Sequence, residues 1–154
     1  MKNIIRPIRN GRPIATTFLA ELKLTEDNKL SKLENKDKII PCNALIDTGA
    51  TISVISKKII EDLKLKPISE TIVGSVSHNN QKTSVYTVHM GIAVNERIVP
   101  TPQGLRQNTE IIWFPISVVA GEAIHEQGID CIIGMNVITS GHLSIAAGHF
   151  IFSI

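Results

Sequence analysis

Apolar and polar residues alternate along much of this chain in short runs, and the runs end at glycine, proline, asparagine or clustered charges. Between residues 18 and 24 the apolar side chains occupy every second position, which is typical of a half-buried strand. Further runs predict strands at Ile39–Ile46, Ile68–Ser77, Thr83–Val94, Ile111–Val119, Ile129–Ile133, Leu143–Ile145 and Phe150–Ile154. No helical repeat is visible, so the predicted class is all-β with one or two short helices.

A short helix is predicted after Ser56, because this serine can cap a first turn and Ile59, Ile60 and Leu63 then share one face. A second short helical pattern follows Gly134.

Three segments are predicted as loops. The charged stretch Thr25 to Lys38 is expected to be a solvated loop. His78 to Gln81, with two asparagines that tolerate positive φ, is predicted as a hairpin tip. Asn95 to Asn108, which holds two prolines and a glycine, is predicted as an irregular loop.

Composition adds mainly exclusions. The chain has 154 residues, 43% hydrophobic and 19% charged, with a net charge of +2, and we expect one domain over residues 1–154. No basic block with interleaved aromatics supports nucleic-acid binding. No apolar run is long enough for a signal peptide or a membrane span, so we expect no membrane partner and a cytoplasmic location. The two cysteines, Cys42 and Cys131, are far apart and are expected to be buried thiols.

One acidic residue stands out. Asp47 ends an apolar run and is followed directly by Thr48, Gly49 and Ala50, with more apolar residues behind. A buried carboxylate is costly unless something compensates it. Asp-Thr-Gly brings together a carboxylate, a hydroxyl and a backbone N–H on a tight turn, which can hold a water molecule in a fixed position. The plain alternative is an ordinary turn aspartate, since Asp and Gly are common in turns.

The sequence context favours the chemical interpretation. A second apolar strand, G-I-D-C-I-I-G-M-N-V-I, is broken by Gly134 and follows the approach F-P-I-S-V-V-A; the tail reads G-H-L-S-I-A-A-G-H-F-I-F-S-I. Together with Asp-Thr-Gly-Ala, these motifs resemble the retropepsin-like aspartic proteases, in their bacterial branch. The resemblance covers roughly residues 39 to 154.

The resemblance implies a small, single-lobe acid-protease fold, a closed β-barrel with one catalytic loop. The chain has no second Asp-Thr-Gly or Asp-Ser-Gly. The second carboxylate would then come from another copy, in a homodimer with the two Asp47 side chains on its axis. The terminal strands, Phe150 to Ile154 and Asn3 to Ile8, are the candidates for interleaving between subunits.

The implied activity is endopeptidase hydrolysis of an extended peptide, without metal or other cofactor. Two carboxylates about 3 Å apart share one proton and activate a water molecule between them. By resemblance, Thr48 links the two loops across the dimer and Gly49 permits the tight turn. Ala50 lacks the hydroxyl that many relatives place there.

The resemblance also assigns a cleft and a flap. The cleft would be lined by Ile132, Ile133 and Gly134, and the hairpin from Val73 to Ser84 would close over the substrate. The flap positions singled out are Gly74, Ser77, His78 and Asn79.

Two features depart from retroviral relatives: Met135 replaces an arginine, and the flap tip lacks glycine. The five histidines have no metal-ligand spacing and are expected to be structural. Two other classes stay open: a non-catalytic dimerisation or peptide-binding module with this fold, and a structural β protein whose Asp47 is a turn residue.

Overall fold

A computed structural model describes residues 2–23, 27, 29, 31–34, 37–75, 78–121 and 128–154. These residues form ten strands and two short helices, so the all-β expectation is confirmed. The elements are β1 (Asn3–Pro7), β2 (Ile14–Glu21), β3 (Ile39–Ile46), β4 (Ser53–Ser56), α1 (Lys57–Asp62), β5 (Ser69–Ser75), β6 (His78–Thr101), β7 (Gly104–Gly121), β8 (Cys131–Ile133), α2 (Met135–Ile138), β9 (His142–Ala146) and β10 (His149–Ser153).

Six strands close into a ring around the core. The seven-stranded sheet has the order β2-β3-β8-β4-β7-β6-β5, and β2 also pairs with β6, so only β5 lies outside the ring. β2 begins at Ile14, earlier than the alternation predicted. Leu19, an off-phase position in that alternation, is fully buried. Burial does alternate along β2, but Ala15, Thr17 and Leu19 are the inward residues, so the strand has the opposite phase to the predicted one. Ala20 is also buried, which breaks the alternation only near the end of the strand.

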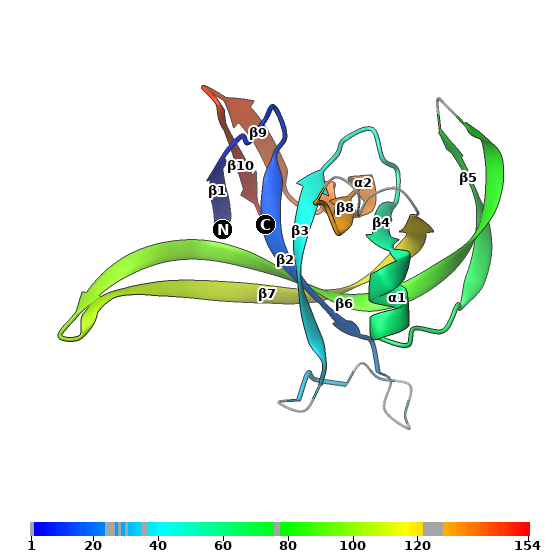
Figure 1. Cartoon of the computed structure of the whole chain (residues 1–154), viewed down its shortest axis with the longest axis horizontal. Coiled ribbons are helices and arrows are strands. Elements are labelled where there is room, and N and C mark those ends of the chain that lie inside the picture. Colours follow the sequence, from blue (N-terminus) through cyan, green and yellow to red (C-terminus); the bar gives the residue numbers. More distant parts are fainter. Residues whose placement is uncertain are drawn as a thin grey trace.

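Strands β3 and β4 meet the distant strand β8 at the centre of the molecule. β8 lies between β3, with which it pairs in parallel, and β4, with which it pairs antiparallel. Ile46 pairs with Ile133, at the end of both strands. The loop after β3 and the turn after β8 are therefore brought side by side (Figure 1).

A separate three-stranded sheet, here called the terminal sheet, has the order β1-β10-β9. Phe150 and Phe152 of β10 are fully buried and anchor it to the core. The predicted closing hairpin is confirmed, with Ala147 and Gly148 in its turn at φ of 50° and 73°. β10 already has a neighbour from its own chain on each side, and its outer face exposes Ile5 and Ile151, which are cross-strand partners.

The predicted loop from Asn95 to Asn108 is wrong. β6 and β7 continue through it as an antiparallel hairpin that projects from the body, paired as far as Thr101 with Gly104 (Figure 1). We call residues 95–110 the arm. Pro100 is compatible with this strand for a geometric reason. A two-residue turn makes Thr101 and Gly104 a hydrogen-bonded pair. Hydrogen-bonded and non-hydrogen-bonded pairs alternate along antiparallel strands, so the next pair, Pro100 with Leu105, requires no backbone N–H from the proline.

The hairpin tip predicted at His78 to Gln81 is also wrong. Gln81 pairs with Val73 and His78 pairs with Ser75, so these four residues belong to β6. The regular pairing of Ser69–Val73 with Val85–Gln81 already directs the following pairs past the asparagines, and the shift between Val73 and Ser75 changes the register by one residue only. A local preference of asparagine for turns does not prevent it from pairing in a strand.

The predicted helix after Ser56 is confirmed as α1, with Ile59 and Leu63 buried, although the Ser56 side chain makes no capping hydrogen bond. The short helical pattern after Gly134 is confirmed as α2. Within the described ranges, neither helix has the length and apolar character needed to cross a membrane.

Candidate active site

Asp47 lies where β3 ends, on a tight turn held by backbone hydrogen bonds. Its N–H donates to the carbonyl of Ile133 at 3.0 Å, and its own carbonyl accepts from Ala50 N at 3.3 Å. One carboxylate oxygen, Oδ1, accepts a hydrogen bond from Gly49 N at 2.8 Å. The side chain is half-buried, while Thr48 and Gly49 beside it are exposed. The carboxylate is therefore fixed in direction on a loop whose outer surface is open.

Glycine at position 134 lets a second turn approach this loop closely. A Cβ there would lie 2.7 Å from the carbonyl carbon of Ile52 and 2.8 Å from the carbonyl oxygen of Ala50. Such contacts with backbone atoms cannot be relieved by a side-chain rotation. Directly after it, Met135 N donates to the carbonyl of Ala50 at 2.7 Å, and Asn136 N donates to the carbonyl of Thr51 at 3.2 Å. The turn after β8 thus supports the loop after β3 along its whole length.

A polar network ties these two turns together. Ser53 is fully buried, and its Oγ donates to Asn136 Oδ1 at 2.7 Å and accepts from Gly134 N at 3.0 Å. Asn136 Oδ1 also accepts from Ser53 N at 2.9 Å, and its Nδ2 donates to the carbonyl of Ser117 at 2.9 Å. The network joins β4, β7, α2 and the turn before α2. It fixes the turn on which the Asp47 loop rests.

Sequence reasoning did not single out Ser53 or Ser117, and gave Asn136 no role in the site. The available signal was Ser53 itself, a hydroxyl in the middle of the apolar run T-I-S-V-I. A fully buried hydroxyl needs a hydrogen-bond partner. The partner is 83 positions away, so no local pattern could identify it.

The other predicted site residues lie in different parts of the fold. Ile132 is half-buried in β8 opposite Leu45 and Val54, whereas the Ile133 side chain is fully buried in the core. Gly74 is in β5, in the hairpin that stands apart from the loop after β3 (Figure 1). A Cβ at Gly74 would meet Asn80 Oδ1 at 2.6 Å.

Three flap positions are only partly accessible to description. Ser77 lies outside the described residues. His78 and Asn79 are placed at the start of β6 by their backbone, and their side chains are not described.

The two buried thiols, Cys42 and Cys131, are expected to be unreactive. Burial raises the pKa of Cys42 to about 12, and burial raises the pKa of the fully buried Cys131 as well. Asp130, next to Cys131, accepts a hydrogen bond from Asn43 N at 3.0 Å and so fastens β3 to the start of β8. Since nucleophilic chemistry of cysteine requires the thiolate, neither thiol is a candidate nucleophile.

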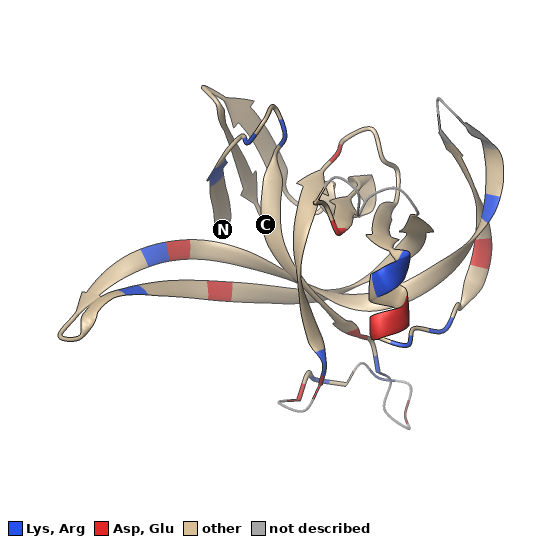
Figure 2. Ribbon diagram, viewed as in Figure 1, with Lys and Arg blue, Asp and Glu red and all other residues tan. Residues whose placement is uncertain are grey.

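The charges of the described residues suggest no other centre. No group of three or more His, Cys, Asp or Glu among them could hold a metal ion. Acidic and basic residues are interspersed over the visible elements instead of forming one patch (Figure 2).

Comparison with known proteins agrees with this geometry. Residues 32–137 match the family model described as aspartyl protease, a span that includes the Asp47 loop and the turn after β8. No curated protein matches the chain.

Two solved structures are similar in fold. A retropepsin-like aspartic protease from Rickettsia conorii superimposes with a TM-score of 0.52 at 16% identity, covering 97% of this chain and 89% of that one. The retroviral protease-like domain of Ddi1 from Leishmania major gives a TM-score of 0.40 at 15% identity, covering 87% and 82%. The first likeness confirms the predicted retropepsin-like fold, and identities this low carry nothing about activity.

Proposed function

Because this chain belongs to the aspartyl protease family, we propose that it is an aspartic endopeptidase that works as a homodimer. Each subunit would supply one Asp47, and the two carboxylates would face each other across a two-fold axis. The observation that carries the proposal is the held carboxylate of Asp47. Its Oδ1 is bound by Gly49 N, its loop is supported by the turn after β8, and the residues next to it are exposed.

We propose a homodimer because one chain supplies one carboxylate of the Asp-Thr-Gly type, and the reaction needs two. The chain encodes one Asp-Thr-Gly loop, and peptide hydrolysis without a metal needs both a general base and a general acid. A two-fold axis beside the exposed Thr48 and Gly49 brings the same loop from a second copy to the first. A monomer would hold half a site.

The proposed reaction uses the pair as acid and base together. Two adjacent carboxylates share one proton, because both cannot easily be charged at such short range. The ionised Asp47 takes a proton from a bound water molecule, which attacks the peptide carbonyl. The protonated Asp47 of the second copy hydrogen-bonds the developing oxyanion. A proton then passes to the leaving nitrogen, and the C–N bond breaks.

The substrate we propose is an extended peptide. β5 is the last strand of its sheet, so its outer edge has no strand neighbour among the described residues. An extended peptide can add to such an edge through main-chain hydrogen bonds. The hairpin of β5 and β6 would act as the flap, for which the sequence singled out Gly74, Ser77, His78 and Asn79.

We further propose that residues 1–154 act as one domain without a cofactor. A cytoplasmic location fits the two buried cysteines, which form no disulfide, because a reducing compartment keeps thiols in that state.

The test is cleavage of a diverse peptide pool by the purified chain and by Asp47→Asn. The amide is nearly isosteric with the carboxylate but cannot act as the base, so cleavage should disappear while the fold persists. Asp62→Asn is the matched control, because it removes the same charge at an exposed carboxylate that pairs with Lys38. Undiminished cleavage by Asp47→Asn would refute the proposal. A parent that binds peptides without cleaving them would instead identify a peptide-binding module.

A further inference from the structure

The arm is a well-formed element, and residues 97–100 and 102–110 in it are exposed in the described part of the chain. From the pair Val94–Glu110 to the pair Thr101–Gly104, β6 advances seven residues. At about 3.3 Å per residue this corresponds to a projection of roughly 23 Å. Thr101 Oγ1 donates to the carbonyl of Gly104 at 2.8 Å and closes the tip. An isolated two-stranded hairpin is marginally stable in water, so an arm of this length calls for a partner surface.

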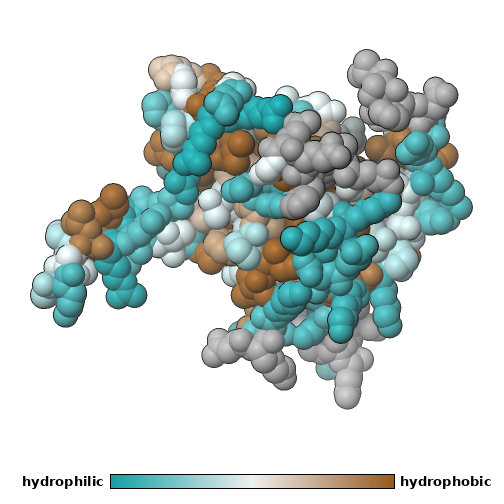
Figure 3. Space-filling view, in the orientation of Figure 1, coloured by the Kyte–Doolittle hydropathy of each residue, from teal (hydrophilic) through white to brown (hydrophobic). Residues whose placement is uncertain are grey.

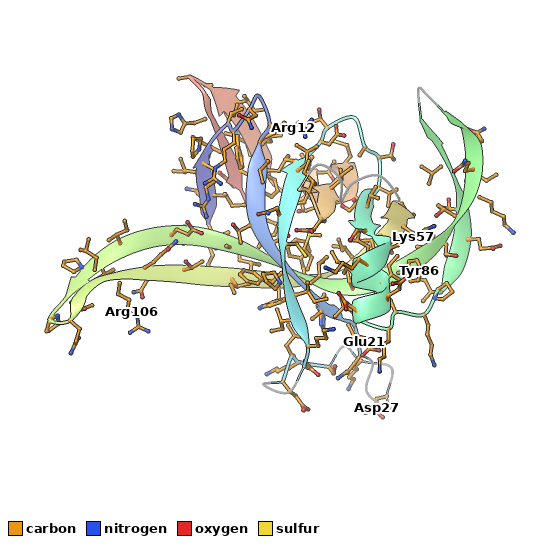
Figure 4. All side chains as sticks on the ribbon, viewed as in Figure 1. Arg12, Glu21, Asp27, Lys57, Tyr86 and Arg106 are labelled. Atoms are coloured by element: carbon orange, nitrogen blue, oxygen red, sulfur yellow. The ribbon has the colours of Figure 1, made fainter. Side chains whose placement is uncertain are left out.

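The two faces of the arm differ in character. Register places Ile98, Pro100 and Leu105 on one face together with Gln107, and Ile98 and Leu105 are 71% and 78% exposed. The opposite face carries Arg97, Val99, Arg106 and Asn108. In Figure 3 apolar side chains gather at the outer end of the arm, and in Figure 4 Arg106 points away from the ribbon into solvent. The arm is thus amphipathic, with one apolar face left open.

The base of the arm is fixed to the terminal sheet. Lys2 forms an ion pair with Glu110 at 3.0 Å, Arg6 forms one with Glu96, and Asn3 N donates to Asn95 Oδ1 at 3.2 Å. These contacts set the direction of the arm relative to β1.

A concave corner lies where β1 meets the base of the arm. It is lined by Asn3 to Arg6 from β1 and by Ala93 and Asn95 to Arg97 from β6. Asn3 Oδ1 is buried there without a hydrogen-bond partner among the described residues. Figure 3 shows the surface hollowed between the terminal sheet and the outer end of the arm. The corner is concave and can receive a protruding segment. It also offers Asn3 Oδ1 as a hydrogen-bond acceptor for a donor of that segment.

The exposed apolar side chains are concentrated on the arm and the terminal sheet, although Val99 and Ile145 lie on the opposite faces of these elements from Leu105 and Ile151. Of the ten large hydrophobic residues exposed in the described part of the chain, four lie on or beside the arm and three on the terminal sheet. They are Ile98, Val99, Leu105 and Ile111, and Ile5, Ile145 and Ile151. By contrast, the exposed residues that follow Asp47 in its loop, Thr48, Gly49 and Thr51, are small. A stable dimer needs about 800 Å² of buried surface on each partner, far more than those three residues offer.

We propose that the arm is a dimerisation arm, and that a second copy of this chain covers its apolar face together with the outer face of the terminal sheet. This inference rests on the proposed function, which requires a second copy at Asp47. In a two-fold dimer each contact occurs twice, so the apolar area that one arm contributes is doubled in the interface. The arm gives the dimer an attachment remote from the catalytic loops.

The test compares dimer dissociation constants by sedimentation over a dilution series of the full chain. Leu105→Glu places a charge on the apolar face, and Asn108→Glu places the same charge on the opposite face, across from Arg97. Leu105→Glu should raise the dissociation constant between about 100-fold and 10,000-fold, because each of two copies loses the burial of a leucine side chain. Asn108→Glu should change it by less than about tenfold.

A second variant removes the arm. Replacing residues 96–109 by one glycine leaves Asn95-Gly between Val94 and Glu110, and Asn95 already has a φ of 50°, as a two-residue turn requires. This variant should be a folded monomer at concentrations where the parent is a dimer. Circular dichroism checks the fold of each variant.

Cleavage by the same samples separates the two proposals. Unchanged dimerisation in Leu105→Glu and in the shortened chain would overturn the arm proposal, whether or not the parent cleaves peptides. A parent that is monomeric throughout would overturn it as well. Dimerisation that depends on the arm, in a parent that cleaves nothing, would support the arm and refute the protease. Recovery of cleavage by Leu105→Glu at high concentration would support both.

Discussion

Replacing Ser53 by alanine should destabilise the Asp47 loop while leaving Asp47 itself unchanged. The change removes one oxygen that both donates to Asn136 Oδ1 and accepts from Gly134 N. Asn136 Oδ1 keeps its bond from Ser53 N, so this loss should cost about 0.5–1.5 kcal/mol. Gly134 N is left buried without that acceptor, which should cost about 1–3 kcal/mol more. Together the free energy of unfolding should fall by about 1.5–4.5 kcal/mol.

The measurement is urea unfolding at a fixed protein concentration. With a slope of about 2 kcal/mol per molar urea, the midpoint should fall by roughly 0.8–2.2 M. Ser56→Ala is the matched control, because Ser56 is a buried serine of the same strand whose side chain makes no capping bond. Its midpoint should shift by less than about 0.5 M.

A double-mutant cycle with Asn136→Ala locates the effect. If the hydroxyl acts through the network, the two changes should be non-additive by about 0.5–3 kcal/mol. Equal midpoint shifts in Ser53→Ala and Ser56→Ala, or simple additivity with Asn136→Ala, would refute the role given to the network. Cleavage should fall further in Ser53→Ala than in Ser56→Ala when both are compared as folded dimers.

Three further outcomes are expected. Gly134→Ala should destabilise the chain by about 1–3 kcal/mol in thermal or urea unfolding, because its Cβ would meet the backbone of Ile52; unchanged stability would contradict the close approach of the two turns. Burial lowers the pKa of His89, so the unfolded chain binds more protons below about pH 6.5, and the free energy of unfolding should decrease as the pH falls from there toward the lowered value. His89→Gln should remove that part of the pH dependence, and an identical slope in the variant would assign it to other groups. Cys42 and Cys131 should react with a maleimide only on unfolding, since burial raises both pKa values; rapid labelling of the native chain, counted by mass spectrometry, would show that the site region opens.

Features encoded by local signals could be predicted from the sequence. Ser56 and the spacing of Ile59 and Leu63 predict α1, and Gly148 marks the turn before β10. The Asp47 turn is local too, because Asp47 Oδ1 bonds to a backbone N–H only two residues away. In each case the residues that determine the structure are neighbours along the chain.

Features that depend on distant pairing could not be predicted in this way. Pro100 and the residues around it favour a loop locally, yet continuous pairing of β6 with β7 produces the arm. The asparagines of the β5–β6 hairpin lie within β6 because the register set by the pair Ser69–Val85 and the pairs after it continues past them. The support of Asp47 by Gly134 and Asn136 joins segments more than 80 residues apart, so alternation within either segment contains no information about it.

The pairing of β3 with β8 also determines when the Asp47 loop can be supported during synthesis. The turn that supports this loop is complete only at Asn136, which is translated 89 residues after Asp47. At about 5–20 residues per second, ribosomes would take roughly 4–18 s to cover that distance. During this time the nascent chain contains Asp47 but not yet the turn after β8 that holds its loop in place. The proposed protease would therefore be inactive during its own synthesis, and a fragment that stops before β8 would lack the turn that supports the Asp47 loop.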